Sequence, residues 1–284
     1  MEFIEHLAFK NSAGCVGFRN NKKDLVDNRI FTLIKKGKIM KILTVLIALS
    51  FTTIGYAQTY QHEPVANKAE YWVSKFAAGK DMNDLLEWSE DYLKFTEGKA
   101  AFANVNSSIM IPYYTSDVNA VDYVWLDIYP NSTEQYAALE ELVTNGAAIS
   151  AKWPGNNIRV ISTWQWEISD SPIGDAANGM VRYQDCTLKE GVTSRDAFDA
   201  YKNFAARAKA AGDTMGRKMI FSESGSNQSF DYVYTLWNSS ISKYGTDSDI
   251  YVSQLLGTAE DKVLDDISTC ANGRTYTSIP VSQP

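Results

Sequence analysis

The feature of this chain that most constrains its fold is an internal repeat. Residues 71–76 read YWVSKF and residues 181–186 read VRYQDC, and each segment leads through a Gly-containing turn into a helical pattern. The tripeptide Asp-Tyr-Val then occurs at 122–124 and again at 231–233. The step from Phe76 to Asp122 is 46 residues, and the step from Cys186 to Asp231 is 45. Such matched spacing predicts one structural unit that is duplicated and fused.

Hydrophobic periodicity and turn residues predict the same element order, β-α-β-β-α-β, in both units. In the first unit we expect strands near 69–76, 108–114, 122–129 and 159–168, with helices over 84–97 and from about 132 to 149. In the second we expect strands over 179–188, 218–224, 230–237 and 274–279, a helix over 194–210, and a helical region broken near Gly257. The predicted division is therefore a first unit over 58–168, a linker over 169–178 and a second unit over 179–284.

The start of the chain predicts export. Lys41 follows Met40, an apolar run covers 42–54, and Gly55-Tyr56-Ala57 places small residues at a cleavage site, as in a secretory signal peptide over 40–57. The apolar run is shorter than the roughly 18 residues that a spanning helix needs. Residues 1–39 are interpreted as an over-long N-terminal extension or a long basic n-region. We therefore expect a periplasmic or secreted protein with no membrane attachment after cleavage.

Charge and cysteine content narrow the function. Segment 1–57 carries nine of the 27 basic and four of the 34 acidic residues, which leaves 18 basic and 30 acidic residues and a net charge of about −12. Such a surface disfavours nucleic acid and anionic lipid as partners. Beyond residue 57 the chain keeps two cysteines, Cys186 and Cys270, which form either a disulfide or two buried free thiols.

The duplicated β-α-β-β-α-β order resembles a tandem member of the dimeric α+β barrel superfamily. The resemblance covers roughly residues 66–282 and implies an α+β fold in which two ferredoxin-like sheets pack face to face around a central pocket. Because the second sheet is supplied by the same chain, we expect a monomer. In this fold the fourth strand runs beside the first, which implies a Cys186–Cys270 disulfide.

The pocket residues are predicted from strand alternation. Val124, Leu126 and Ile128 alternate with the aromatic and acidic residues between them, so the two sets lie on opposite faces of a strand. We assign the aliphatic set to the helices and the other set to the pocket. The predicted ligand-binding residues are Tyr123, Trp125, Asp127, Tyr129, Trp164, Tyr232 and Tyr234.

Histidine is scarce, which excludes several kinds of site. The chain has two histidines: His6 lies in the N-terminal extension, and His62 lies in the N-terminal stretch ahead of the first predicted strand. A Ser-His-Asp triad, a His-ligated zinc and a His-ligated haem all need an imidazole. Haem-handling members of the superfamily typically use a histidine ligand, so we expect no cofactor and no metal, although haem ligation by tyrosine stays formally open.

Two carboxylates are the candidate catalytic groups. Asp127 and Asp185 lie within strands rich in aromatic residues, where a buried carboxylate acquires a raised pKa and can act as a base. The alternative is that each is paired with a nearby Arg or Lys. Asp122 and Asp231 precede their strands, so we expect a turn or capping role for them.

Three functions remain open. The first is an exported protein that binds a small aromatic or partly apolar molecule between the two sheets. The second is a cofactor-independent oxygenase- or isomerase-type enzyme of the antibiotic-monooxygenase-like kind, and the third is an interaction module with a filled barrel. An inward carboxylate beside a tyrosine favours the enzyme, and a pocket of aromatic and amide groups favours binding.

Overall fold

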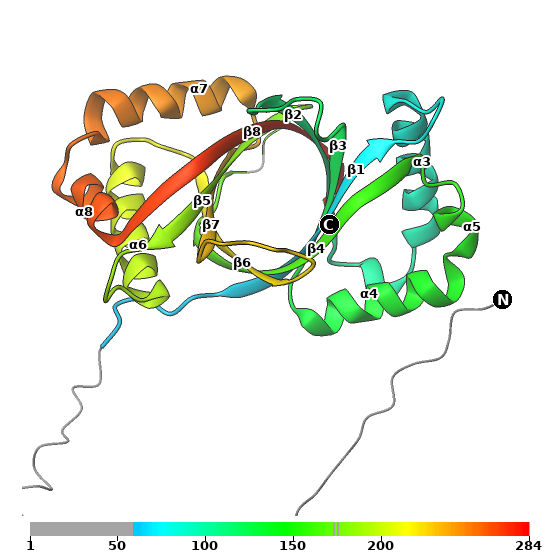
Figure 1. Ribbon diagram of the computed structural model, residues 1–284, viewed down its shortest axis with the longest axis horizontal. Coiled ribbons are helices and arrows are strands. Elements are labelled where there is room, and N and C mark those ends of the chain that lie inside the picture. Colours follow the sequence, from blue (N-terminus) through cyan, green and yellow to red (C-terminus); the bar gives the residue numbers. More distant parts are fainter. Residues whose placement is uncertain (1–58, 173, 175, 284) are drawn as a thin grey trace, which may run out of the picture. The chain divides into compact units, whose positions relative to one another are not determined.

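The strands of the two repeats form one closed barrel in the computed structural model, which describes residues 59–172, 174 and 176–283 (Figure 1). The signal-peptide prediction therefore lies outside the described residues. The strands are β1 (Ala66–Phe76), β2 (Asn106–Tyr114), β3 (Tyr123–Tyr129), β4 (Gly155–Ser169), β5 (Gly179–Leu188), β6 (Gly216–Ser224), β7 (Tyr232–Asn238) and β8 (Ser268–Ser282). Their order around the barrel is β1-β3-β2-β8-β5-β7-β6-β4, with every neighbouring pair antiparallel.

Helices cover the outside of the barrel on two sides (Figure 1). The first half contributes α3 (Met82–Thr96), the short 3-10 turn η1 (Ala100–Phe102), α4 (Ser132–Asn145) and α5 (Ala147–Ser150). The second half contributes α6 (Ser194–Ala210), α7 (Ile241–Ile250), the π-helical turn η2 (Tyr251–Leu255) and α8 (Ala259–Ile267). No helix in the described part of the chain has the length and apolar character needed to cross a membrane.

Local sequence explains where the principal helices begin. Asp81 caps α3, where its carboxylate accepts hydrogen bonds from the N–H groups of Asn83 and Asp84. In return, the Asp84 carboxylate accepts a hydrogen bond from the Asp81 N–H. Thr193 and Asp196 form the corresponding capping box of α6. A capping box satisfies backbone donors that the first turn of a helix leaves without partners. The two repeats thus start their first helix with the same device.

The repeated aspartates join equivalent strands by equivalent hydrogen bonds. The Asp122 carboxylate accepts from the Phe76 N–H at 2.8 Å, while its own N–H donates to the Ser74 carbonyl. In the second half, the Asp231 carboxylate accepts from the Leu188 N–H at 2.7 Å, and its N–H donates to the Cys186 carbonyl. Phe76 therefore corresponds to Leu188, two residues beyond the Cys186 that the sequence comparison matched to it. Because this correction shifts the alignment of the two repeats by an even number of residues, the assignment of side chains to the two faces of the strand is unchanged.

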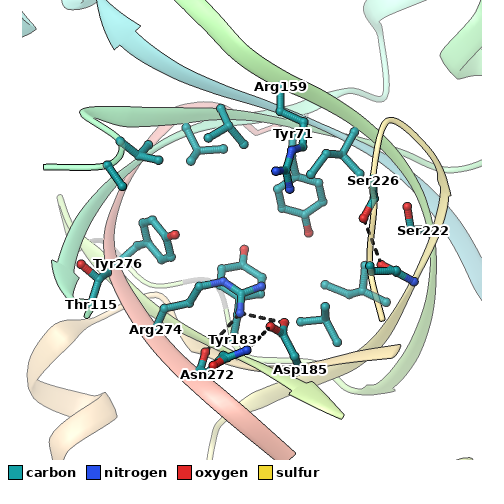
Figure 2. A pocket seen from close by; sticks show the side chains of 18 of the residues that line it. Tyr71, Thr115, Arg159, Tyr183, Asp185, Ser222, Ser226, Asn272, Arg274 and Tyr276 are labelled. Carbon is teal, nitrogen blue, oxygen red and sulfur yellow. Dashed lines mark hydrogen bonds and ion pairs between the residues drawn. The ribbon is translucent and has the colours of Figure 1, made fainter. Parts of the chain in front are cut away.

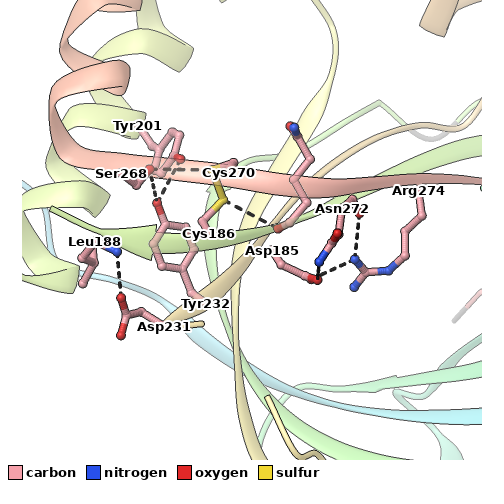
Figure 3. Close-up of a disulfide and its surroundings, with 11 residues drawn as sticks. Asp185, Cys186, Leu188, Tyr201, Asp231, Tyr232, Ser268, Cys270, Asn272 and Arg274 are labelled. Carbon is pink, nitrogen blue, oxygen red and sulfur yellow. Dashed lines mark hydrogen bonds and ion pairs between the residues drawn. A yellow bond between two sulfur atoms is a disulfide. The ribbon is translucent and has the colours of Figure 1, made fainter. Parts of the chain in front are cut away.

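The disulfide implied by the resemblance is present. Cys186 and Cys270 are directly opposite each other on β5 and β8, and their sulfur atoms are bonded (Figure 3). The bond joins the first and last strands of the second half across 84 positions of sequence. Cys186 is fully buried beside Tyr232 and Phe198, in the layer between the strands and α6.

The face assignment made from alternation is wrong, because β3 turns its aromatic residues toward the helices. Tyr123 and Trp125 pack with Leu85 and Trp88 of α3, and the Trp88 and Trp125 rings meet edge to face at 5.0 Å. The aliphatic set, Val124, Leu126 and Ile128, faces the barrel interior. Side chains diverge on the convex side of a curved sheet and converge on the concave side, so the bulkier rings fit outside and the smaller side chains fit inside.

Candidate functional site

The barrel interior holds two cavities at opposite ends of the strands. The first has a volume of about 600 Å³ and is lined by the ends of β1, β2, β5 and β6 together with the beginnings of the other four strands. The second, of about 470 Å³, lies at the other end of the barrel. Four side chains border both cavities and form a waist between them: Tyr71, Met110, Tyr183 and Ile220.

Two tyrosines from equivalent positions meet at the waist. The strand equivalence fixed by Phe76 and Leu188 makes Tyr71 the counterpart of Tyr183, and their rings meet edge to face at 6.2 Å. The Tyr71 hydroxyl accepts a hydrogen bond from Gln165 Nε2 at 2.8 Å. The Tyr183 hydroxyl donates to Met110 Sδ at 3.1 Å. Burial raises the pKa of both phenols above the ordinary tyrosine value, so both are neutral hydrogen-bonding groups at neutral pH.

Beyond the waist, the first cavity has one charged side and one apolar side. Asp185 on β5 forms an ion pair with Arg274 on β8 at 2.8 Å and accepts a hydrogen bond from Asn272 (Figure 2). The corresponding positions of the first half are Val73 and Ile161, because Tyr71 pairs with Ile161 as Tyr183 pairs with Arg274. Equivalent positions of the two halves are therefore charged in the second half and apolar in the first.

Arg159 stands at the mouth of this cavity. It is an exposed residue of β4, and its guanidinium extends over the lumen beside Tyr71 (Figure 2). Among the described residues it has neither an ion pair nor a hydrogen bond, whereas the carboxylate of Asp185 is engaged by Arg274. The mouth therefore presents an available cation above an apolar wall.

The turn between β6 and β7 forms part of the same mouth, and a glycine sets its position. Gly225 has a φ of +77°, and a Cβ at this position would lie 1.9 Å from the carbonyl oxygen of Val160. Only glycine allows this approach and this backbone conformation. The close approach holds Ser226, Asn227 and Gln228 against the cavity that they help to line.

Of the predicted site residues, Asp185 lines the first cavity and Tyr129 borders the second. Trp164 lies on the outer side, where its Nε1 donates to Glu223 and its ring lies 4.6 Å from Lys68 Nζ. The remaining predicted residues line neither cavity and pack on the helix side: Tyr123, Trp125, Asp127, Tyr232 and Tyr234. Tyr232, for example, donates a hydrogen bond to Ser268 beside the disulfide (Figure 3).

Asp127 is buried without a basic partner among the described residues. Ser107 Oγ donates to its carboxylate at 2.6 Å. Burial raises the pKa of Asp127 to about 7, and the nearby Glu70 carboxylate adds to the rise, while the Ser107 hydrogen bond opposes it. The raised pKa predicted from sequence is therefore present, but the group lies outside both cavities.

Most of the residues that line the cavities were missed because the inward face of β3 was assigned incorrectly. With that assignment reversed, alternation along β1 and β5 selects Tyr71 and Tyr183, and the register with β4 and β8 selects Arg159 and Arg274. The sequence repeat therefore contained the information needed to find these residues, once the two halves are aligned through Asp122 and Asp231.

The described residues do not fit a haem held by histidine. His62 lies against the outside of α6, where its backbone N–H donates to Asp199 Oδ1 at 2.9 Å and its ring nitrogen lies 3.4 Å from Asn203 Oδ1. It lines neither cavity. The tyrosines at the waist have raised pKa values, which disfavours the phenolate form that a metal would need. Within residues 59–172, 174 and 176–283, His, Cys, Asp and Glu form no group of three or more that could hold a metal ion.

Comparison with known proteins identifies the fold. No protein-family profile matches the sequence, and a search of curated proteins found no match. Among solved structures, a protein of Fusobacterium nucleatum named for a proposed monooxygenase activity matches with a TM-score of 0.50 and 13% identity, over 78% of this chain and 94% of that one. A chlorite dismutase mutant of Candidatus Nitrospira defluvii matches with a TM-score of 0.46 and 7% identity, over 79% and 95% of the two chains. A haem-binding protein of Thermus thermophilus matches with a TM-score of 0.43 and 8% identity, over 78% and 95%.

At 13% identity, the match to the Fusobacterium nucleatum protein shows a shared fold and says nothing of a shared activity. The element order, the duplication and the closed barrel agree with the resemblance found in the sequence. The chain has the fold of a tandem, ferredoxin-like member of the dimeric α+β barrel superfamily.

Proposed function

We propose that the protein binds a small, flat, partly apolar organic acid in the first cavity. The observation that carries the proposal is Arg159, a cation with no ion pair among the described residues, at the mouth of an otherwise apolar wall. A ligand carboxylate would form a charge-assisted hydrogen bond with the Arg159 guanidinium. This bond would fix the orientation of the ligand, with its body directed toward the waist.

The wall below Arg159 suits the body of such a molecule. Val73, Val124 and Ile161 supply aliphatic surface on one side, and the rings of Tyr71 and Tyr183 form the floor. A volume of about 600 Å³ is in the range of small-molecule sites. Neutral phenol hydroxyls at the floor can donate or accept one hydrogen bond each, which suits a ligand with a polar atom at its inner end.

The partners of Asp185, the candidate catalytic base, favour a binding function over an enzymatic one. An inward carboxylate beside a tyrosine, the arrangement expected of an enzyme, does occur at Asp185 and Tyr183. The Arg274 guanidinium, however, neutralises Asp185 at 2.8 Å, and Asn272 occupies a further acceptor site on the same carboxylate. The carboxylate of Asp185 is therefore already engaged by two partners of the same cavity wall, and the tyrosine beside it is a neutral phenol.

The surroundings proposed for this binding are extracytoplasmic. The Cys186–Cys270 disulfide is consistent with an oxidising compartment. We propose that the protein works there as a monomer, since its own two halves close the barrel. The acidic surface makes nucleic acid an unfavourable partner.

The proposal is tested with matched acids and amides. Isothermal titration calorimetry compares benzoate with benzamide and indole-3-acetate with indole-3-acetamide, on the wild type and on Arg159→Gln. The acids should bind the wild type more tightly, and Arg159→Gln should lose about tenfold or more in affinity for the acids while the amides change little. Ile161→Trp, which fills the apolar side, should weaken acids and amides alike.

The control is Arg207→Gln, which removes an exposed arginine from the last turn of α6, far from the cavity lining. It should leave binding unchanged, and thermal denaturation of each variant checks that the fold is retained. Equal affinity for acids and amides in the wild type, or equal losses in Arg159→Gln and Arg207→Gln, would refute the assignment.

A further inference from the structure

The second cavity contains a lysine in an unusual setting. Lys218 on β6 lines this cavity, and its Nζ lies 3.2 Å from both Asn67 Oδ1 and Gln165 Oε1. The ring of Trp237 lies on another side, with its centroid 5.4 Å from Nζ. Within the described residues this amine has amide and aromatic partners and no ion pair, so it differs from a typical structural lysine.

Lys68 shows by contrast what a structural buried lysine looks like in the same barrel. It is fully buried on the outer side of β1, and its Nζ forms an ion pair with Glu223 at 2.5 Å. Ser162 Oγ and the ring of Trp164 complete its surroundings. Among the described residues, Lys218 has no such ion pair with a carboxylate.

Burial lowers the pKa of Lys218 below the ordinary lysine value, although the more distant charges of Glu167 and Asp170 oppose the change. Glu167 is opposite Lys218 in the β4–β6 register and is exposed at the rim of the cavity. Asp170, also exposed, lines the cavity as well. The remaining titratable groups of the lining are the phenols of Tyr71, Tyr129 and Tyr183, which are uncharged at neutral pH. The neutral amine, which is the nucleophilic form, is therefore more populated at Lys218 than at a solvated lysine.

The surrounding amides fix the position of this nitrogen. Gln165 directs its oxygen to Lys218 and its Nε2 to the hydroxyl of Tyr71, 2.8 Å away. Asn67 Nδ2 donates to Gln165 Oε1 at 3.3 Å and to the Lys68 carbonyl at 3.1 Å. This network holds Nζ beside a cavity of about 470 Å³, which has room for a small aldehyde or ketone.

We propose that Lys218 is the reactive amine of a second site, in the cavity opposite the first, which takes small carbonyl compounds as imines. The nitrogen lone pair forms a bond to the carbonyl carbon, and both amine hydrogens leave with the carbonyl oxygen as one molecule of water. The condensation needs no oxidant, reductant or cofactor. Water that enters the cavity reverses it, so the site captures its ligand reversibly.

The test traps the imine. The purified protein is treated with benzaldehyde and sodium cyanoborohydride, which reduces an imine to a stable secondary amine, and peptide mass spectrometry gives the rate for each lysine as a function of pH. At pH 7 Lys218 should react about tenfold or more faster than the exposed Lys243, and its rate should reach half-maximum at a lower pH. Lys68 should remain unmodified.

Two matched variants examine the cause. Asn67→Asp places a carboxylate 3.2 Å from Lys218 Nζ and should slow modification about tenfold or more at pH 7, whereas Asn106→Asp adds the same charge elsewhere in the cavity lining and should change it far less. A rate for Lys218 no higher than for Lys243, or equal effects of the two variants, would overturn the proposal. Arg159→Gln should leave this reaction unchanged, so failure of either proposed site is recognised separately.

Discussion

The buried carboxyl of Asp127 predicts a specific dependence of stability on pH. Its pKa is raised from 3.8 to about 7 by burial, so the folded state keeps a proton over a range in which the unfolded chain has lost it. The contribution of Asp127 to stability should therefore be highest at low pH, fall as the pH rises from about 4 toward 7, and level off above 7. One unit of pKa corresponds to about 1.4 kcal/mol, so the complete loss amounts to about 4 kcal/mol, of which about 2 to 3 kcal/mol falls between pH 5 and pH 8.

Asp127→Asn tests this reasoning because an amide keeps the shape of the side chain and never ionises. Ser107 Oγ can donate to the amide oxygen as it does to the carboxylate. Urea unfolding followed by tryptophan fluorescence, at pH 5 and at pH 8, gives the free energy of unfolding of both proteins. We expect the variant to gain about 2 to 3 kcal/mol relative to the wild type between the two pH values.

Other groups titrate over the same range, so the test compares the change in the free energy of unfolding between pH 5 and pH 8 in the variant with the same change in the wild type. Asp266→Asn removes an exposed carboxylate of α8 and serves as the control for loss of one charge. It should show the same pH dependence as the wild type. If Asp127→Asn and Asp266→Asn also change in parallel with pH, burial does not perturb Asp127 and the argument fails.

Three further variants test the architecture. Replacing Cys186 and Cys270 together by serine should lower the free energy of unfolding by about 2 to 4 kcal/mol, because the unfolded chain loses a crosslink between residues 84 positions apart. An unchanged midpoint of unfolding in urea would contradict this. Peptide mapping without reductant checks that the two cysteines are paired in the wild type. Asp231→Asn should cost about 1 to 2 kcal/mol through its weakened bond to the Leu188 N–H, and hydrogen exchange at that amide should rise while distant amides stay protected. Trp125→Ala should cost about 3 to 5 kcal/mol yet leave acid binding in the first cavity unchanged, since its ring faces α3; selective loss of binding in a folded variant would restore the original face assignment.

The duplication was predictable because its evidence is local and occurs twice. Asp122 and Asp231 each bridge the end of one strand to the start of another, so their spacing from the preceding strand is fixed by a hydrogen bond. The disulfide followed from the topology that the spacing implied, and Cys186 and Cys270 are indeed opposite each other.

The interior could not be assigned in the same way. Both faces of β3 are mostly apolar, with Asp127 the one charged residue, so a period of two separates Val124 from Trp125 without showing which of them faces the helices. That choice depends on curvature, which belongs to the closed barrel as a whole. The pairing of Asp185 with Arg274 and the isolation of Lys218 depend on cross-strand register and bulges, which no single stretch of sequence contains.

The order of strands around the barrel has one more consequence. Each strand of the first half is followed, four places further around, by its counterpart in the second half, so a half-turn about the barrel axis relates the two halves. In a dimer of identical chains this axis would be an exact twofold, and a molecule lying on it would meet every side chain twice, on opposite sides. Here Val73 is across from Asp185 and Ile161 across from Arg274, so the fused chain can hold an unsymmetrical molecule in a single orientation.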